Sequence, residues 1–280
     1  MELTNVLFLD TETTGIPPRS ANWETDFADY PHVVQIAWLH GCKVESHIIR
    51  PDGWEIPEES IAVHGITMEK ALADGEPFAV VVDMLVADCH DAGLICGHNV
   101  HFDTGIIKAN ILRELGREYY DANDVENALF KGKRLDTMRA TMKWVDARMA
   151  NGRLKFSNLS ELYARCFPGE TFPAHDALED CKAVARCLPV LLENGLLELK
   201  VKQYDETTQA PAPSVLKMDP LTQKMAEKFG QSPETVKNSP KIAPNFQNDK
   251  LPIQQEKVAQ NENSGKITPE LRSLLEQNDF

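Results

Sequence analysis

The chain lacks the segments that would carry it through or into a membrane. Its first residues, MELTNVLFLD, have no basic start, and Asp10 interrupts their apolar run, so they do not fit a secretory signal peptide. No stretch approaches the roughly 20 consecutive apolar residues that a membrane-spanning helix needs. We therefore expect a protein without membrane contact.

Cysteines are few, and no two of them form the C-x-x-C pattern of zinc and redox sites. They sit inside apolar segments, which is typical of buried free thiols in a reducing compartment and favours these over disulfides or zinc ligands. We therefore expect the protein to be cytoplasmic. The six cysteines are Cys42, Cys89, Cys96, Cys166, Cys181 and Cys187.

The chain also has no excess of positive charge. Its 43 acidic and 29 basic residues give a net charge of −14. A protein that held nucleic acid by broad neutralisation of phosphates would be basic. Two alternatives remain: the carboxylates are gathered at a metal site whose cations attract phosphate, or the protein binds no nucleic acid. Residues 1–204, with 32 acids and 20 bases, carry −12 of this charge, so the acidity belongs to that part.

The composition changes near residue 204. Residues 205–280 hold eight of the 17 prolines, many Gln, Asn and Lys, and very few aromatics. Such a segment cannot bury enough apolar surface to offset the entropy of ordering. We therefore predict a folded domain over 1–204 and a largely disordered tail over 205–280. Two stretches, 219–229 and 268–277, have helix-start signals, so the tail is either a linker or a docking segment for a partner such as a polymerase or a clamp.

Hydrophobic patterns within 1–204 predict an α/β fold. Three strands come first and helices then alternate with a further strand, which gives a mixed β-sheet flanked by helices. The predicted strands cover 5–12, 33–40, 43–51 and 93–99. The predicted helices cover 60–66, 77–91, 101–116, 133–145, 159–167 and 176–196.

The first group of chemically active residues ends the first strand. Asp10 and Glu12 are two positions apart, so their carboxylates point to the same face of the strand. Two carboxylates so close repel each other unless a cation lies between them. Thr13, Thr14 and Gly15 follow, and the glycine lets the backbone turn and approach a ligand closely. The alternative is a polar strand end that runs into a loop.

The second group, Gly97-His98-Asn99-Val100-His101-Phe102-Asp103, lies where a short buried strand ends and a helix begins. Ligand sites in open α/β sheets favour such strand ends. Asp103 could simply cap the helix. However, the polar residues that precede it are more than a cap requires.

The third group is His175-Asp176-Ala177-Leu178-Glu179-Asp180. Asp176 and Glu179 have the spacing of a capping box, so a helix is predicted to start at Asp176 with His175 in the preceding loop. On one continuous helix His175 and Asp180 would point about 140° apart and could not converge. A histidine in the loop can converge with Asp180 and is well placed to take a proton from water at a metal.

Together the three groups resemble the DEDDh family of 3′–5′ exonucleases, which has the ribonuclease H-like fold and includes the proofreading epsilon subunit of bacterial DNA polymerase III. The resemblance rests on D-x-E-T-T-G at 10–15, G-H-N-x-x-F-D at 97–103 and H-D-A-L-x-D at 175–180, in that order. Residues 56–67 also resemble the family's segment before its second motif. The resemblance covers about residues 4–195 and shows no departure at the four carboxylates or the histidine.

The resemblance implies a two-metal site that releases nucleoside 5′-monophosphates from a 3′ end. Two divalent cations, Mg²⁺ or Mn²⁺, would lie about 4 Å apart, and His175 would take a proton from the attacking water. The acidic residues that would hold the cations are Asp10, Glu12, Asp103 and Asp180. The residues implied or considered as contacts to the terminal nucleotide or its phosphate are Thr13, Thr14, Gly15, His64, His98 and Asn99; for the three last-named residues a structural role is the alternative.

The expected substrate is the 3′ end of single-stranded DNA, in proofreading or in DNA repair and processing. A related enzyme that degrades RNA or short oligonucleotides is an alternative, because the motifs do not distinguish one phosphodiester from another. A catalytically silent module that binds nucleic acid or a partner is the alternative from another class. The presence of all five catalytic positions argues against that last alternative.

Two features are weaker. Asp136 is interpreted as a helix cap or a group beside the metal ligands rather than a ligand. Basic residues also flank two loops and could guide an incoming strand, although a solvated surface is the more common role of such residues. These basic residues are Lys131, Lys133, Arg134, Arg148, Arg153 and Lys155.

Overall fold

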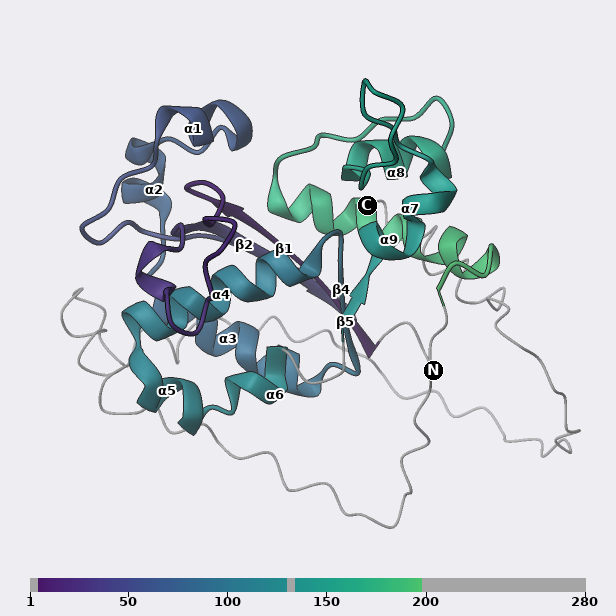
Figure 1. The fold of residues 1–280 in the computed structure, drawn as a ribbon. Helices are drawn as coiled ribbons and strands as arrows, with labels where there is room; N and C mark the ends of the chain where they lie inside the picture. The colour runs from purple at the N-terminus through teal and green to yellow at the C-terminus, as the bar shows by residue number, and fades with distance from the viewer. Residues whose placement is uncertain (1–4, 130–133, 198–280) are drawn as a thin grey trace, which may run out of the picture. The chain divides into compact units, whose positions relative to one another are not determined.

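The computed structural model describes residues 5–129 and 134–197 of the chain, and Figure 1 shows their arrangement. Some expectations drawn from the sequence lie outside these residues. They are the tail over 205–280 with its two short helices, the domain boundary at residue 204, and the basic residues Lys131 and Lys133.

A five-stranded mixed sheet forms the centre of the described part, in the order β3-β2-β1-β4-β5. The pairs β1–β2 and β2–β3 are antiparallel, whereas β4 runs parallel to both β1 and β5. The predicted α/β class, with a mixed sheet flanked by helices, is therefore confirmed. The strands are β1 (Val6–Thr13), β2 (Val33–His40), β3 (Lys43–Ile48), β4 (Leu94–Gly97) and β5 (Arg134–Asp136).

Helices occupy the connections after β3. Among the described residues, three lie between β3 and β4, three between β4 and β5, and three follow β5. A short 3-10 helix, η2 (Phe27–Asp29), lies between β1 and β2. The α-helices are α1 (Glu58–His64), α2 (Met68–Asp74), α3 (Phe78–Asp91), α4 (Val100–Glu114), α5 (Gly116–Ala122), α6 (Val125–Leu129), α7 (Thr137–Val145), α8 (Leu159–Cys166) and α9 (Ala177–Glu193).

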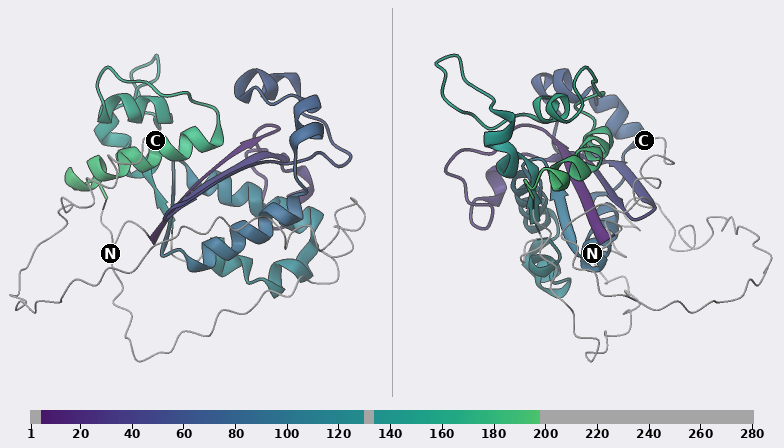
Figure 2. Two further views of the ribbon diagram at one scale, coloured as in Figure 1. Left: turned by 180° about the vertical axis from the view of Figure 1, so that it is seen from behind. Right: turned by 90° about the vertical axis from the view of Figure 1, so that its right-hand side faces the viewer.

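Helices cover both faces of the central strands, with α9 on one face and α3 and α4 on the other (Figures 1 and 2). All but the last residue of β2 are buried, as expected for a strand covered on both faces. On the α9 side Phe8 and Ala37 pack with Cys181 of the helix. Because side chains alternate along a strand, Phe8, Asp10 and Glu12 share this face, whereas Thr11 points toward α4.

One predicted helix is wrong in its first part. We expected a single helix over 133–145, but Arg134–Asp136 form β5 and the helix α7 begins at Thr137. The three residues of β5 pair in parallel with Ile95–Gly97, which lie far away in the sequence. Such a short strand carries no usable period of its own, so tertiary pairing decides its conformation. Asp136 caps α7, accepting hydrogen bonds from two backbone amides of its first turn, as interpreted.

Two expectations about composition can be compared with the structure. The six cysteines are free, but Cys42 lies exposed in the turn between β2 and β3 rather than buried. No helix among the residues placed by the structure is long and apolar enough to cross a membrane.

Candidate active site

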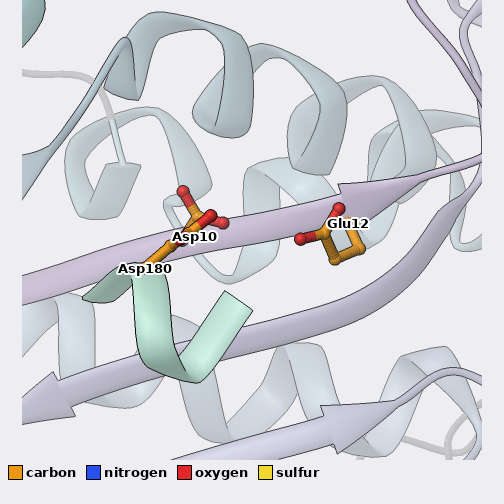
Figure 3. Close-up of side chains that lie close together, drawn as sticks. All are labelled: Asp10, Glu12 and Asp180. Carbon is orange, nitrogen blue, oxygen red and sulfur yellow. The ribbon is translucent and has the colours of Figure 1, made fainter. Parts of the chain in front are cut away.

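Three acidic side chains meet where the carboxyl end of β1 lies beside the first turn of α9 (Figure 3). Asp10 and Glu12 come from β1 and Asp180 comes from α9, and one carboxylate oxygen of each lies within 4.8 Å of the others. The spacing of Asp10 and Glu12 directs both side chains to the face that α9 covers. The structure thus brings together three of the four acidic residues identified in the sequence.

The fourth, Asp103, reaches the same region from α4. It is buried, with 3% of its surface exposed. Its Oδ1 accepts hydrogen bonds from the backbone amide of Thr11 at 3.1 Å and from Thr11 Oγ1 at 2.8 Å. Asp103 exerts the largest charge effect on the pKa of Asp10, so the two carboxylates are neighbours. It does not cap the helix, because the N-cap of α4 is Asn99, so the cap alternative is wrong.

The turn between β4 and α4 places Asp103 and depends on two unusual residues. A Cβ atom at Gly97 would lie 2.8 Å from the carbonyl oxygen of Leu9, so only glycine lets β4 approach β1 this closely. Asn99 has a φ of 73°, a left-handed conformation that asparagine tolerates better than most residues. Its backbone amide donates to Asp136 Oδ1 at 3.1 Å. Its side chain makes no capping hydrogen bond.

His98 uses both ring nitrogens within the protein. Nδ1 lies 3.1 Å from Thr137 Oγ1, and Nε2 lies 2.9 Å from the carbonyl oxygen of Ser157. Of the two roles considered for His98, these contacts favour the structural one over direct contact with a phosphate.

The N-terminus of α9 is held by the neighbouring strand as well as by its own cap. Asp176 accepts hydrogen bonds from the backbone amides of Leu178 and Glu179. Gln35 Oε1, from β2, accepts a hydrogen bond from the backbone amide of Ala177 at 3.2 Å, and Gln35 Nε2 donates one to Asp176 Oδ2 at 3.3 Å. These bonds attach the start of α9, and with it Asp180, to the sheet.

His175 lies in the loop just before this cap, outside the helix. It has a φ of 71° and an exposed side chain. Its backbone amide lowers the pKa of Asp180, which places the residue beside the acidic cluster. The imidazole is therefore at the edge of the site and open to solvent.

Burial raises the pKa of every acidic residue in the cluster, and neighbouring carboxylates add to the effect. Burial, together with Asp180, Asp176 and Asp103, raises the pKa of Glu12 to about 8. The pKa of Asp103 rises to about 7 mainly through burial, although the hydrogen bonds from Thr11 oppose the change. Burial also raises the pKa of Asp180 to about 7. Burial and the surrounding carboxylates raise the pKa of Asp10 well above its usual range.

This cluster fits a divalent metal. None of its four members takes part in the ion pairs found among the described residues, so no side-chain cation is seen to offset its charge. Asp180 Oδ1 is buried and lacks a hydrogen-bond partner, as expected for an atom that coordinates a metal ion when one is bound. Carboxylate oxygens are the donors that Mg²⁺ and Mn²⁺ prefer.

The loop after β1 borders the cluster. Thr13 Oγ1 donates to the carbonyl oxygen of Gly15 at 2.7 Å. Thr14 is held by His32 through two bonds, because its amide donates to the carbonyl oxygen of His32 and its Oγ1 accepts from the amide of His32. Gly15 has a φ of 153°, and a Cβ there would meet no atom within 4 Å, so open space lies beside its backbone.

His64 ends α1 and does not belong to the carboxylate cluster. Its Nδ1 accepts a hydrogen bond from the amide of Ile66 at 3.1 Å. Its Nε2 is buried without a hydrogen-bond partner, and burial lowers its pKa. Contact with a nucleotide therefore stays a prediction for this residue.

Two residues of the site were missed by the sequence analysis, Thr11 and Gln35. Thr11 lies between the two metal-ligand candidates of β1 and points to the opposite face, where it holds Asp103. Gln35 is the only polar residue in the interior of the buried stretch VVQIAWL, and that isolation was a usable signal. A polar side chain inside a buried strand needs a hydrogen-bond partner, although the sequence does not say which.

Fold and site together define a ribonuclease H-like domain with a carboxylate cluster at the end of its central strand. Residues 7–188 match the family model RNase_T, described as Exonuclease, and the chain belongs to this exonuclease family. The match confirms the resemblance to the 3′–5′ exonucleases of the DEDDh type that the motifs indicated.

Solved structures with the same fold include several of exonuclease I. A product-bound structure of exonuclease I has a TM-score of 0.52 and 20% identity over 68% of this chain and 44% of that one. The zinc-bound form of the E. coli complex with single-stranded DNA gives 0.51 and 20% over 68% and 40%. The E. coli complex with a dT13 oligonucleotide gives 0.52 and 20% over 68% and 41%. The chain thus matches less than half the length of these proteins. A comparison with curated proteins gave no match.

Proposed function

We propose that this protein is a metal-dependent 3′–5′ exonuclease that releases nucleoside 5′-monophosphates from the 3′ end of DNA, in proofreading or in DNA repair and processing. The observation that carries the proposal is the convergence of Asp10, Glu12 and Asp180 within 4.8 Å. The neighbouring carboxylate of Asp103 completes the set of four. Four neighbouring carboxylates, two buried and two half-buried, without a described cation partner are costly unless metal ions neutralise them.

In this proposal the four carboxylates hold two divalent ions, Mg²⁺ or Mn²⁺. When bound, such ions supply positive charge at the scissile phosphate and at the leaving 3′ oxygen, and they make water more acidic. Thr11 keeps Asp103 turned toward the site by occupying its Oδ1 with two hydrogen bonds. Gln35 keeps Asp180 in place by holding the start of α9.

His175 is the proposed general base. Its imidazole is exposed at the edge of the cluster, so it can accept the proton of a water molecule that attacks the terminal phosphodiester. The attack breaks the bond between phosphorus and the 3′ oxygen of the preceding nucleotide. That oxygen leaves with a proton, and the terminal nucleotide departs with its 5′ phosphate. The Thr13–Gly15 loop is proposed to lie against the terminal nucleotide, because open space borders Gly15.

Single-stranded DNA is the proposed substrate. The exonuclease I structures with the same fold include complexes with single-stranded DNA and with a dT13 oligonucleotide, which supports this choice. The free state of all six cysteines supports the expectation of a reducing, cytoplasmic location. A polymerase or clamp that binds residues 205–280 remains part of the proposal, and truncation after Tyr204 tests it through loss of partner binding.

The direct test is a gel assay with a 5′-labelled single-stranded DNA oligonucleotide and its RNA counterpart, each with Mg²⁺, Mn²⁺ or EDTA. We expect a ladder that shortens from the 3′ end, disappears in EDTA and is abolished by Asp10→Asn. Asp91→Asn, the same change at an exposed acid, is the control and should cleave like the wild type. Faster cleavage of the RNA would replace DNA by RNA as the substrate. No cleavage with either metal would contradict the proposed function.

A further inference from the structure

The segment over residues 139–156, here called the basic segment, differs in charge from the rest of the domain. It has five basic residues and one acidic residue, a net charge of +4, whereas residues 1–204 as a whole carry −12. The basic residues are Arg139, Lys143, Arg148, Arg153 and Lys155, and the acidic residue is Asp146. A local reversal of charge of this kind favours the approach of a polyanion to an acidic protein.

The second half of the basic segment is a hairpin that projects between α7 and α8 (Figure 2). Arg148 and Leu154 form its antiparallel bridge, and the amide of Met149 donates to the carbonyl oxygen of Arg153 at 2.8 Å. Large apolar side chains lie on its surface, because Met149 is 52% and Phe156 is 46% exposed.

One histidine holds both ends of the basic segment next to the proposed active site. His98 contacts Thr137 Oγ1, just before the segment, and the carbonyl oxygen of Ser157, just after it. His98 itself follows β4 and lies in the turn that leads into α4, the helix that carries Asp103. The basic segment therefore begins and ends beside the turn that positions one of the proposed metal ligands.

Three of the five cations are paired with acids: Arg148 with Asp146, Lys155 with Glu161, and Arg139 with Asp136. The guanidinium of Arg139 also lies 5.8 Å from the ring centre of Phe156. Lys143 and Arg153 are exposed, and the ion pairs found among the described residues include neither. The segment thus offers two exposed cations outside these ion pairs, Lys143 and Arg153, and an exposed aromatic ring, Phe156.

We propose that the basic segment binds the single-stranded part of the nucleic acid that leads to the 3′ end, with Phe156 stacking on a base and Lys143 and Arg153 contacting phosphates. Positive charge combined with an aromatic platform is how proteins hold single strands without regard to sequence. The inference rests on the proposed function, which places the 3′ end among the carboxylates. It adds a second point of attachment for the strand, separate from the metal site.

The test measures binding apart from cleavage. Fluorescence anisotropy with a 5′-labelled dT20 strand is recorded in EDTA, where no metal-dependent cleavage occurs, over a range of salt concentrations. Phe156→Ala is compared with Leu72→Ala, which removes an exposed apolar side chain from α2. Lys143→Gln combined with Arg153→Gln is compared with Lys70→Gln combined with Arg117→Gln, which removes the same charge from α2 and α5. Circular dichroism confirms that each variant is folded.

We expect Phe156→Ala to weaken binding by about tenfold, the usual effect of losing one stacked base. The double variant Lys143→Gln with Arg153→Gln should make the negative slope of log affinity against log salt shallower by about 1.4. This change corresponds to two fewer phosphate contacts on a single strand. Neither control should change the affinity or the slope. A purely structural role of the segment would not change the salt slope.

Three results would overturn the proposal: no binding of dT20 by the wild type, variants that bind as their controls do, or equally tight binding of a poly-glutamate peptide. The last result would assign the surface to an acidic protein partner. The gel assay separates the two proposals. Cleavage by the wild type with unaffected variants contradicts only the strand-binding surface, and weakened variants without any cleavage contradict only the exonuclease.

Discussion

Gln35 and Asp176 are 141 positions apart in the chain, yet Gln35 Nε2 donates a hydrogen bond to Asp176 Oδ2 at 3.3 Å. The Oε1 atom of the same side chain accepts a hydrogen bond from the backbone amide of Ala177. Gln35 also lies opposite Glu12 in the register of β1 and β2. One buried amide of β2 therefore fixes the start of α9, which carries Asp180, next to the strand that carries Glu12.

Gln35→Leu should lower the cleavage rate by about 10- to 100-fold, because small displacements of catalytic groups cost about that much. It should also lower the free energy of unfolding by about 1–3 kcal/mol, since the buried polar groups it serves lose their partner. Single-turnover cleavage and urea unfolding measure the two effects. Ser46→Ala is the control, because it removes only the bond from Gln35 Nε2 to Ser46 Oγ and leaves the contacts with α9. Unchanged cleavage by Gln35→Leu would show that the contact has no positioning role.

The metal-free protein should lose stability as the pH rises. Folding raises the pKa of Glu12 from 4.5 to about 8 and those of Asp103 and Asp180 from 3.8 to about 7. Between these values the unfolded chain has released protons that the folded chain retains. Each group then lowers the free energy of unfolding by about 1.4 kcal/mol per pH unit. The contribution is fully present below about pH 4 and is lost as the pH rises through about 7 to 8.

Thermal unfolding in EDTA at about pH 5 and about pH 8 measures this dependence. Mg²⁺ should restore more stability at the higher pH, because the carboxylates bind a metal in their deprotonated form. Glu12→Gln should flatten the pH dependence, since the amide cannot titrate. A melting temperature in EDTA that rises between the two pH values would contradict the raised pKa values that we infer for the cluster.

His175→Asn should lower the cleavage rate by about 10²- to 10⁴-fold, the usual contribution of a general base. The fold should be unaffected, because the imidazole is exposed and asparagine tolerates the left-handed φ of 71° at this position. Cleavage rates and melting temperatures are compared with those of His90→Asn, which changes an exposed histidine of α3. If His175→Asn keeps the wild-type rate, another group must take the proton.

Gly97→Ala and Gly105→Ala form a matched pair. A Cβ at Gly97 would lie 2.8 Å from a backbone oxygen of β1, so the first change should destabilise the protein by about 1–3 kcal/mol. A Cβ at Gly105, within α4, would meet nothing within 4 Å, so the second change should stabilise it by up to about 1 kcal/mol. Urea unfolding measures both. Equal effects of the two changes would contradict the close packing of β4 on β1 described above.

Much of the fold could be predicted because its elements have local signals. Each of these signals spans only a short stretch of consecutive residues. The signals are the buried runs of β1, β2 and β4, the amphipathic pattern of α4 and the capping residues of α9. The elements that escaped prediction are short. The strand β5 and the helices α2, α5 and α6 are each too brief to show a clear period, and β5 forms because β4 lies beside it.

The residue types of the site were also readable from the sequence. The spacing of Asp10 and Glu12 alone indicates two carboxylates on one face of a strand, and Asp176 indicates the loop position of His175. These inferences hold without the structure because side-chain direction follows from the geometry of one strand or one helix start.

Only the tertiary structure decided which groups meet. It brought Asp180 within 4.8 Å of Asp10 and Glu12, tied Asp103 to Thr11, and used Gln35 to hold α9. These contacts join residues that are far apart in sequence, where no local pattern relates one side chain to the other. Their geometry depends on how the helices pack across the sheet, and that packing is a property of the whole domain rather than of any single segment.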